Sequence, residues 1–287
     1  MEATLSLLEP LRFMTLALSY LPGTLTRLLL ARDYATLLSV TRLRAAWFAR
    51  FWRSVGPEIR KNAGKNVIPL LQGRVTHGVV PTSSDGSGSG EESHPHPPVQ
   101  GTVLEVGPGT GLWVSVFSPA AQLLPGVRKV FGVEPNADVH VELRGRVAEA
   151  GLLEDGTYEI VPVGIEELER DGRVGEGSVD CIVTIMCLCS IPEPRYNCAQ
   201  LYRYLKPGGR WYVYEHVRCF HSQGIFMRTY QYLLNFFWPR IIGGCEMCRD
   251  TATTLREAGP WSQVDLHPLQ GEPWFYTMPH IIGVLTK

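Results

Sequence analysis

From about residue 101 onward, the chain alternates between short apolar runs and longer amphipathic stretches. The apolar runs predict buried strands at 102–107, 128–133, 157–163, 178–188, 209–216, 261–268 and 276–286. The amphipathic stretches predict helices at 112–123, 138–150, 195–205 and within 223–258. Strands that alternate with helices favour an α/β fold, in which a mostly parallel sheet carries helices on both faces.

The segment 1–31 is rich in leucine, but charged residues and a Pro22-Gly23 pair interrupt it. The uncharged stretch between Arg12 and Arg27 is shorter than the roughly 20 residues that a simple membrane-spanning helix needs. A basic leader and a small-residue cleavage site are both missing, so we do not expect a signal peptide. Two interpretations stay open: a monotopic anchor in a membrane interface, and a helical pair that caps a pocket of the following domain.

Residues 35–55 have a helical pattern with an aromatic face formed by Trp47, Phe48, Phe51 and Trp52. Packing of this face on the folded domain is the favoured interpretation, and contact with a membrane interface is the alternative. Residues 81–98 are rich in Gly, Ser and Pro, which is typical of a flexible linker. We therefore predict an apolar and basic helical arm at 1–80, a flexible linker at 81–99 and a catalytic domain at 100–287.

The composition and charge of the chain limit the kinds of partner that it can bind. The chain has 287 residues and a net charge of −1, so no global nucleic-acid-binding field is expected. Residues 27–65 carry nine Arg and Lys against two acids, and such a basic arm favours an anionic lipid surface. The seven cysteines are an odd number without regular spacing, which indicates free thiols in a reducing compartment. Cys245 and Cys248 form a single CxxC without a second pair, so no metal site is predicted.

The most informative stretch is Thr102-Val-Leu-Glu-Val-Gly-Pro-Gly-Thr-Gly111. Its first half reads as a buried strand, and its three glycines form a turn at the carboxyl end of that strand. This architecture binds ligands there, and glycine lets a ligand approach the backbone closely. Leu112 occupies the position where a dinucleotide fingerprint has its third glycine, so a pyrophosphate is not the favoured ligand.

The stretch resembles motif I of class I S-adenosylmethionine (SAM)-dependent methyltransferases. The next predicted strand ends at Glu134, where an acid can accept both ribose hydroxyls. The resemblance implies a Rossmann-like domain whose seven-stranded sheet has the order 3-2-1-4-5-7-6, with SAM as cofactor. The residues expected to bind SAM are Glu105, Gly107, Gly109, Thr110, Gly111, Glu134, Pro135, Gly164, Ile165 and Thr184.

A Leu205-Lys-Pro-Gly-Gly209 turn precedes the strand that carries Glu215 and His216 to the carboxyl edge. We interpret His216 as the candidate base, because its unperturbed pKa lies near neutral, and Glu215 as its support. A His216 that only orients a loop is the alternative. If the apolar residues within 223–240 line the pocket, the acceptor is apolar; plain core packing of these residues is the alternative. The residues expected to line the acceptor pocket are Cys187, Tyr230, Phe237 and Cys245.

Further stretches resemble one branch of this class, the membrane-associated alkyl thiol methyltransferases of the endoplasmic reticulum and lipid droplets. They include Leu188-Cys-Ser190, Glu215-His-Val217 and Gly244-Cys245. The resemblance implies methyl transfer from SAM to a small thiol, in the cytosol or on the cytosolic face of these membranes. Two alternatives stay open: an O- or N-methyltransferase that tailors a small secondary metabolite, and a non-catalytic lipid-surface protein with a vestigial SAM fold.

Overall fold

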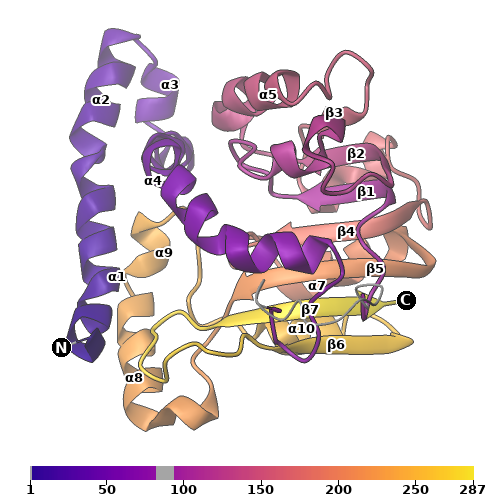
Figure 1. Cartoon of the computed structure of the whole chain (residues 1–287). Helices are drawn as coiled ribbons and strands as arrows, with labels where there is room; N and C mark the ends of the chain where they lie inside the picture. Colours follow the sequence, from indigo (N-terminus) through magenta and orange to yellow (C-terminus); the bar gives the residue numbers. More distant parts are fainter. Residues whose placement is uncertain (1, 82–93) are drawn as a thin grey trace.

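A computed structural model describes residues 2–81 and 94–287, and its centre is one seven-stranded sheet (Figure 1). The strands have the order β3-β2-β1-β4-β5-β7-β6, which confirms the predicted order. Their bounds are β1 Gly101–Val106, β2 Val127–Val133, β3 Tyr158–Val161, β4 Val179–Ile185, β5 Leu205–His216, β6 Gln263–Pro268 and β7 His280–Thr286. All neighbours pair in parallel except β7, which runs antiparallel to both β5 and β6.

Ten α-helices are assigned within the described residues. Their bounds are α1 Glu2–Ser19, α2 Leu21–Leu30, α3 Tyr34–Leu37, α4 Val40–Leu71, α5 His140–Glu149, α6 Leu168–Asp171, α7 Pro194–Tyr204, α8 Gly224–Asn235, α9 Trp238–Ile241 and α10 Thr251–Arg256. Helices α4 and α5 contribute to the apolar core on one face of the sheet. Helices α6, α7 and α10 contribute to the core on the other face, so both faces are covered, as predicted.

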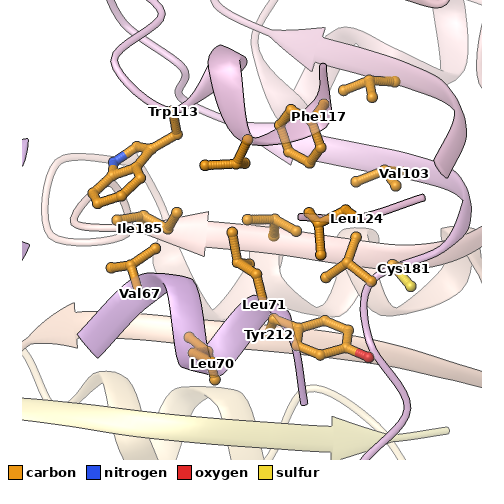
Figure 2. Packing of buried hydrophobic residues seen from close by; sticks show 14 of the residues in the cluster. Val67, Leu70, Leu71, Val103, Trp113, Phe117, Leu124, Cys181, Ile185 and Tyr212 are labelled. Atoms are coloured by element: carbon orange, nitrogen blue, oxygen red, sulfur yellow. The ribbon is translucent and has the colours of Figure 1, made fainter. Parts of the chain in front are cut away.

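The carboxyl-terminal half of α4 belongs to the core of the sheet. Val67, Leu70 and Leu71 are essentially inaccessible to solvent, and they pack against strand residues such as Cys181 and Tyr212 (Figure 2). The sequence correctly predicted a helix within 35–55, but the predicted end is wrong, because α4 continues to Leu71. Burial of this apolar surface stabilises the helix although its interior contains proline.

Further sequence predictions of local structure are wrong. Residues 112–123 form two short 3-10 helices, Val114–Phe117 and Pro119–Ala121, in place of one α-helix. Pro119 disfavours helical backbone at the residue before it, and Ser118 is accordingly extended with φ −64° and ψ 131°. Strand β4 ends at Ile185 and not at the predicted position 188, because Met186 adopts φ +52° and turns the chain out of the sheet.

The N-terminal segment is less interrupted than its sequence indicated. Pro22 lies in the first turn of α2, where the amide N–H that proline lacks is not needed for the helix. Among the described residues, Ala3–Leu30 is the one helical segment that is long and apolar enough to cross a membrane by length and composition. The exposed leucines of this segment are Leu5, Leu8, Leu11, Leu16, Leu18, Leu29 and Leu30.

Most of the predicted linker, residues 82–93, lies outside the described residues. His96, which was expected in a solvated loop, is buried, and its Nε2 lies 2.7 Å from Oδ2 of Asp265 on β6. The Thr76 hydroxyl donates to the same carboxylate oxygen at 2.8 Å. Through these contacts Asp265 connects the segment after α4 and the segment before β1 to β6, the edge strand of the sheet.

Candidate functional site

The glycine turn after β1 has a backbone that only glycine adopts without strain. Gly107, Gly109 and Gly111 have φ of +64°, +57° and +82°, all in the left-handed region. A Cβ at Gly107 would lie 2.8 Å from the Cβ of Cys187, and one at Gly111 would lie 2.9 Å from Leu143. Neither Gly107 nor Gly111 therefore has room for a side chain.

Glu134 stands beside this turn, at the carboxyl end of β2. Its Oε2 accepts a hydrogen bond from the amide of Gly109 at 2.9 Å, and its Oε1 accepts one from the amide of Asn136 at 2.8 Å. Burial raises the pKa of Glu134 and outweighs these two amides, which act in the opposite direction. The acid and the glycine turn are thus in direct contact, as the resemblance to motif I implies.

Glu105 points across the sheet and does not lie on the turn itself. Its Oε2 accepts a hydrogen bond from the Tyr158 hydroxyl at 2.6 Å, and burial raises the pKa of Glu105 to about 7. This bond passes over β2 at Gly132, where a Cβ would lie only 2.2 Å from the Tyr158 oxygen. Sequence reasoning missed Tyr158, although Gly132 in the middle of an apolar strand was a signal of a close approach.

Helix α4 covers the glycine turn. The Trp52 indole nitrogen would be 3.9 Å from a Cβ on Gly109, so the ring lies above the turn. Nε of Arg53 forms an ion pair with Glu142 of α5 at 2.5 Å. The Arg60 guanidinium donates to the Leu112 carbonyl at 2.8 Å. The aromatic face read from the sequence thus packs on the domain, and one member of it contacts the site.

The opposite side of the site is held together by Glu215, at the end of β5. Its two carboxylate oxygens accept hydrogen bonds from the amides of Cys187 and Leu188, at 3.1 and 3.2 Å. Burial raises the pKa of Glu215 to about 8. The carboxyl group therefore fixes the turn after β4, which brings Cys187 against Gly107.

His216 lies next to Glu215 and faces two thiols. Its Nε2 is 3.1 Å from the sulfur of Cys245, and the indole nitrogen of Trp238 is 3.3 Å from the same sulfur. Cys189 completes the group, and the ligand atoms of Cys189, His216 and Cys245 all lie within 4.8 Å of one another. Burial lowers the pKa of His216, but Cys189 and the charge of Glu215 together raise it by more. Nδ1 of His216 has no hydrogen-bond partner within the described residues.

The N-terminal arm covers this trio. Met14 and Ala17 of α1, Phe51 of α4 and Trp238 of α9 belong to the same apolar cluster as Cys189 and Cys245. The Trp47 indole donates to the Ala17 carbonyl at 2.7 Å and so ties α4 to α1. The inner face of α1 is therefore a cap, while the leucines of its outer face are exposed.

Other residues predicted for the site have different surroundings. The Thr184 hydroxyl accepts a hydrogen bond from the Trp211 indole inside the core, and both oxygens of Thr110 accept from Arg146. The Tyr230 hydroxyl donates to the Leu7 carbonyl, and the Phe237 ring is largely exposed. The remaining SAM candidates are Pro135, which is exposed after β2, and Gly164 and Ile165, which are buried after β3.

Comparison with known proteins agrees with this geometry. A family model described as a methyltransferase domain matches residues 89–258. Thiol S-methyltransferase TMT1B of Rattus norvegicus is 32% identical over 188 residues, which cover 65% of this chain and 70% of that protein. Human thiol S-methyltransferase TMT1A is 29% identical over 187 residues, with the same coverage. The solved structure of an O-methyltransferase family protein from Burkholderia thailandensis has a TM-score of 0.51 and 12% identity, over 86% of this chain and 60% of that chain.

The sheet order, the glycine turn and the matched family model define the class: this chain belongs to the methyltransferase-domain family and is a class I SAM-dependent methyltransferase. The residues are compatible with SAM, because a Cβ does not fit at Gly107 or Gly111 and the buried Glu134 carboxylate lies beside the same turn. Within this class the chain lies close to the thiol S-methyltransferase branch, as its curated relatives show.

Proposed function

We propose that this methyltransferase transfers the methyl group of SAM to the sulfur of a small apolar thiol. The observation that carries the proposal is the group formed by Cys189, His216 and Cys245. Apolar residues of α1, α4 and α9 cover this group. The names of the curated relatives, thiol S-methyltransferases at 28–32% identity, support the same acceptor class.

SAM supplies an electrophilic methyl group, so the protein chiefly has to position the acceptor and exclude water. A thiol is a far stronger acid than an alcohol, and the cysteine thiol has a pKa of about 8.5, so a weak base can help to deprotonate it near neutral pH. In the proposed reaction, the buried Nδ1 of His216 receives the proton of the thiol, since this nitrogen has no other partner in the described part of the chain. Glu215 positions His216 and the Cys187 turn.

The test offers purified protein methyl-labelled SAM together with a panel of alkyl thiols, phenols, amines and carboxylic acids. We expect label on apolar thiols. Gly109→Val is the matched control, because a side chain at φ +57° strains the turn and should abolish SAM binding. Label on oxygen or nitrogen acceptors, with thiols unlabelled, would refute the acceptor class and leave the methyltransferase fold intact.

We also infer that the outer face of α1 and α2 rests on an anionic lipid surface. Leu29 and Leu30 are 55% and 81% exposed, and the basic stretch 27–65 begins beside them. In flotation with anionic vesicles, most of the wild-type protein should float with the vesicles. A smaller fraction of the double variant Leu29→Ser, Leu30→Ser should do so. Val141→Ser on α5 changes an equally exposed apolar residue and is the control. If the double leucine variant and Val141→Ser float to the same extent, the proposed contact of α1 and α2 with the lipid surface is refuted.

A further inference from the structure

We propose that Cys189, His216 and Cys245 bind one thiophilic divalent cation of the zinc class, and that the sulfur of the acceptor is its fourth ligand. The second clause rests on the proposed function, whereas the ion site itself does not. The three ligands come from the turn after β4, the end of β5 and the turn after α9. They lie far apart in the sequence, which is why the CxxC spacing did not reveal them.

The spacing of the ligand atoms suits such an ion. The three atoms lie within 4.8 Å of one another, and Nε2 of His216 is 3.1 Å from the Cys245 sulfur. A tetrahedral zinc ion with Zn–S near about 2.3 Å and Zn–N near about 2.0 Å places its ligand atoms roughly 3.6 to 3.8 Å apart. Small rotations of the side chains therefore reach the required geometry without movement of the backbone.

The charges also balance. Two thiolates and one neutral imidazole carry a charge of −2, which one divalent cation neutralises. This matters because Cys189, His216 and Cys245 are only 3%, 7% and 7% exposed, and an uncompensated charge at such depth is costly. Soft thiolate and imidazole ligands select zinc or copper over magnesium and calcium.

The backbone around the trio is fixed in advance. The amide of Glu246 donates to the carbonyl of Cys189 at 3.0 Å, so the two cysteine turns are hydrogen-bonded to each other. The Arg249 guanidinium donates to the carbonyls of Leu188 and Ile191 at 2.7 and 2.6 Å. These bonds hold both thiols in place, and little conformational entropy is left to lose when an ion binds.

Neighbouring polar groups contact both sulfurs. The Trp238 indole donates to the Cys245 sulfur at 3.3 Å, and the Ser190 hydroxyl is 3.4 Å from the Cys189 sulfur. Such outer contacts orient ligands and tune the metal in known sites. Cys248, the second cysteine of the CxxC, lies instead against the Gln231 side chain at 3.7 Å and is not part of the group.

Three protein ligands leave a fourth position, as in catalytic zinc sites. An acceptor thiol held there would release its proton to solvent, and its sulfur would attack the methyl carbon of SAM. The old carbon–sulfur bond would break with its electron pair on the leaving sulfur, giving a methyl thioether and S-adenosylhomocysteine. Cys187 connects the two sites, since it lies against Gly107 and on the same turn as Cys189. In the metal-free chain Nδ1 of His216 is the base proposed above; with the ion bound through Nε2, His216 would be a ligand and the ion would promote the deprotonation.

The site is tested with full-length protein that has been treated with a chelator under reducing, anaerobic conditions and titrated with Co²⁺ without acceptor. We expect one equivalent to produce sulfur-to-cobalt charge-transfer absorption and strong four-coordinate visible bands, and Zn²⁺ to remove both. Cys189→Ser, Cys245→Ser and His216→Ala should bind at least tenfold more weakly. Cys248→Ser is the matched control and should bind like the wild type. Circular dichroism and thermal unfolding identify variants that fail to fold.

Absence of charge transfer in folded wild-type protein, or equal spectra for wild type and Cys189→Ser, would overturn the ion site. An apolar alkanethiol added before SAM should shift the charge-transfer band, and an unchanged band would overturn the fourth-ligand assignment. Full thiol methylation by metal-free protein would also overturn it. If Co²⁺ binds as expected but thiols are methylated by neither form, the proposed function fails and the ion site stands.

Discussion

The buried carboxyl of Glu105 allows a sharp prediction about stability and pH. In the folded protein, burial raises the pKa of Glu105 to about 7, and the Tyr158 hydroxyl only partly opposes this. In the unfolded chain, the same group titrates near its ordinary pKa of 4.5. Between these two values the folded state holds a proton that the unfolded state has lost. The free energy of unfolding therefore falls as the pH rises through this window, and it levels off above pH 7.

The two pKa values set the size of the effect. Their difference corresponds to about 3 kcal/mol, most of which is lost between pH 5 and pH 8. Glu105→Gln removes the ionisation and keeps an oxygen that can accept from Tyr158. We expect the variant to lie within about 1 kcal/mol of the wild type at pH 5 and to be about 3 kcal/mol more stable at pH 8.

Urea unfolding of both proteins at several pH values measures this difference, and other titrating groups cancel when the two curves are subtracted. Tyr158→Phe is the companion variant. It removes the hydrogen bond that lowers the pKa of Glu105, so the stability loss should extend to higher pH. A difference between wild type and Glu105→Gln that stays constant from pH 5 to pH 8 would refute the reasoning.

Three further substitutions test the packing around the site. Gly132→Ala places a Cβ 2.2 Å from the Tyr158 oxygen, so urea unfolding should show a loss of about 3 kcal/mol. Asp265→Ala leaves His96 buried without its carboxylate, and urea unfolding at pH 7 should show a loss of about 3 kcal/mol. Arg53→Ala releases α4 from α5 above the glycine turn, and calorimetry should show SAM binding weakened several-fold at little loss of stability.

Two of these substitutions have a matched control. Gly145→Ala in α5 adds a Cβ that meets nothing within 4 Å and should be neutral or stabilising. Arg173→Ala removes a partly exposed ion pair far from the glycine turn and should leave SAM affinity unchanged. If Gly132→Ala and Gly145→Ala lower the free energy of unfolding equally, the close approach at Gly132 is contradicted. If Arg53→Ala binds SAM as tightly as the wild type, the role of α4 above the glycine turn is contradicted.

The sequence predicted what depends on local chemistry. Strand order followed from the resemblance, and the glycine turn with Glu134 was found because both lie in short, characteristic stretches. The 3-10 helices at 114–121 were missed, since an apolar periodicity outweighed a single proline in the prediction. Met186 could not be predicted to end β4, because methionine rarely adopts a positive φ and only the surrounding contacts impose it.

Long-range contacts account for what was missed in the site. Tyr158 and Glu105 are distant in the sequence, and they meet only because β3 and β1 flank β2 at Gly132. Trp52 reaches the glycine turn because the other half of α4 is anchored in the sheet. Cys189 and Cys245 lie in separate stretches of the sequence, the first within Leu188-Cys-Ser190 and the second in the CxxC, and neither stretch predicted that they would meet at His216.

The position of β7 has a consequence for biosynthesis. This strand follows the six others in the sequence, yet it lies inside the sheet between β5 and β6. The sheet therefore cannot close until β7 has left the ribosome, while the leucine-rich helices α1 and α2 have emerged before it. During that interval their apolar surface has no partner within the protein, so chaperones or a nearby membrane would have to cover it. Removal of β7 by a premature stop would take a strand out of the middle of the sheet.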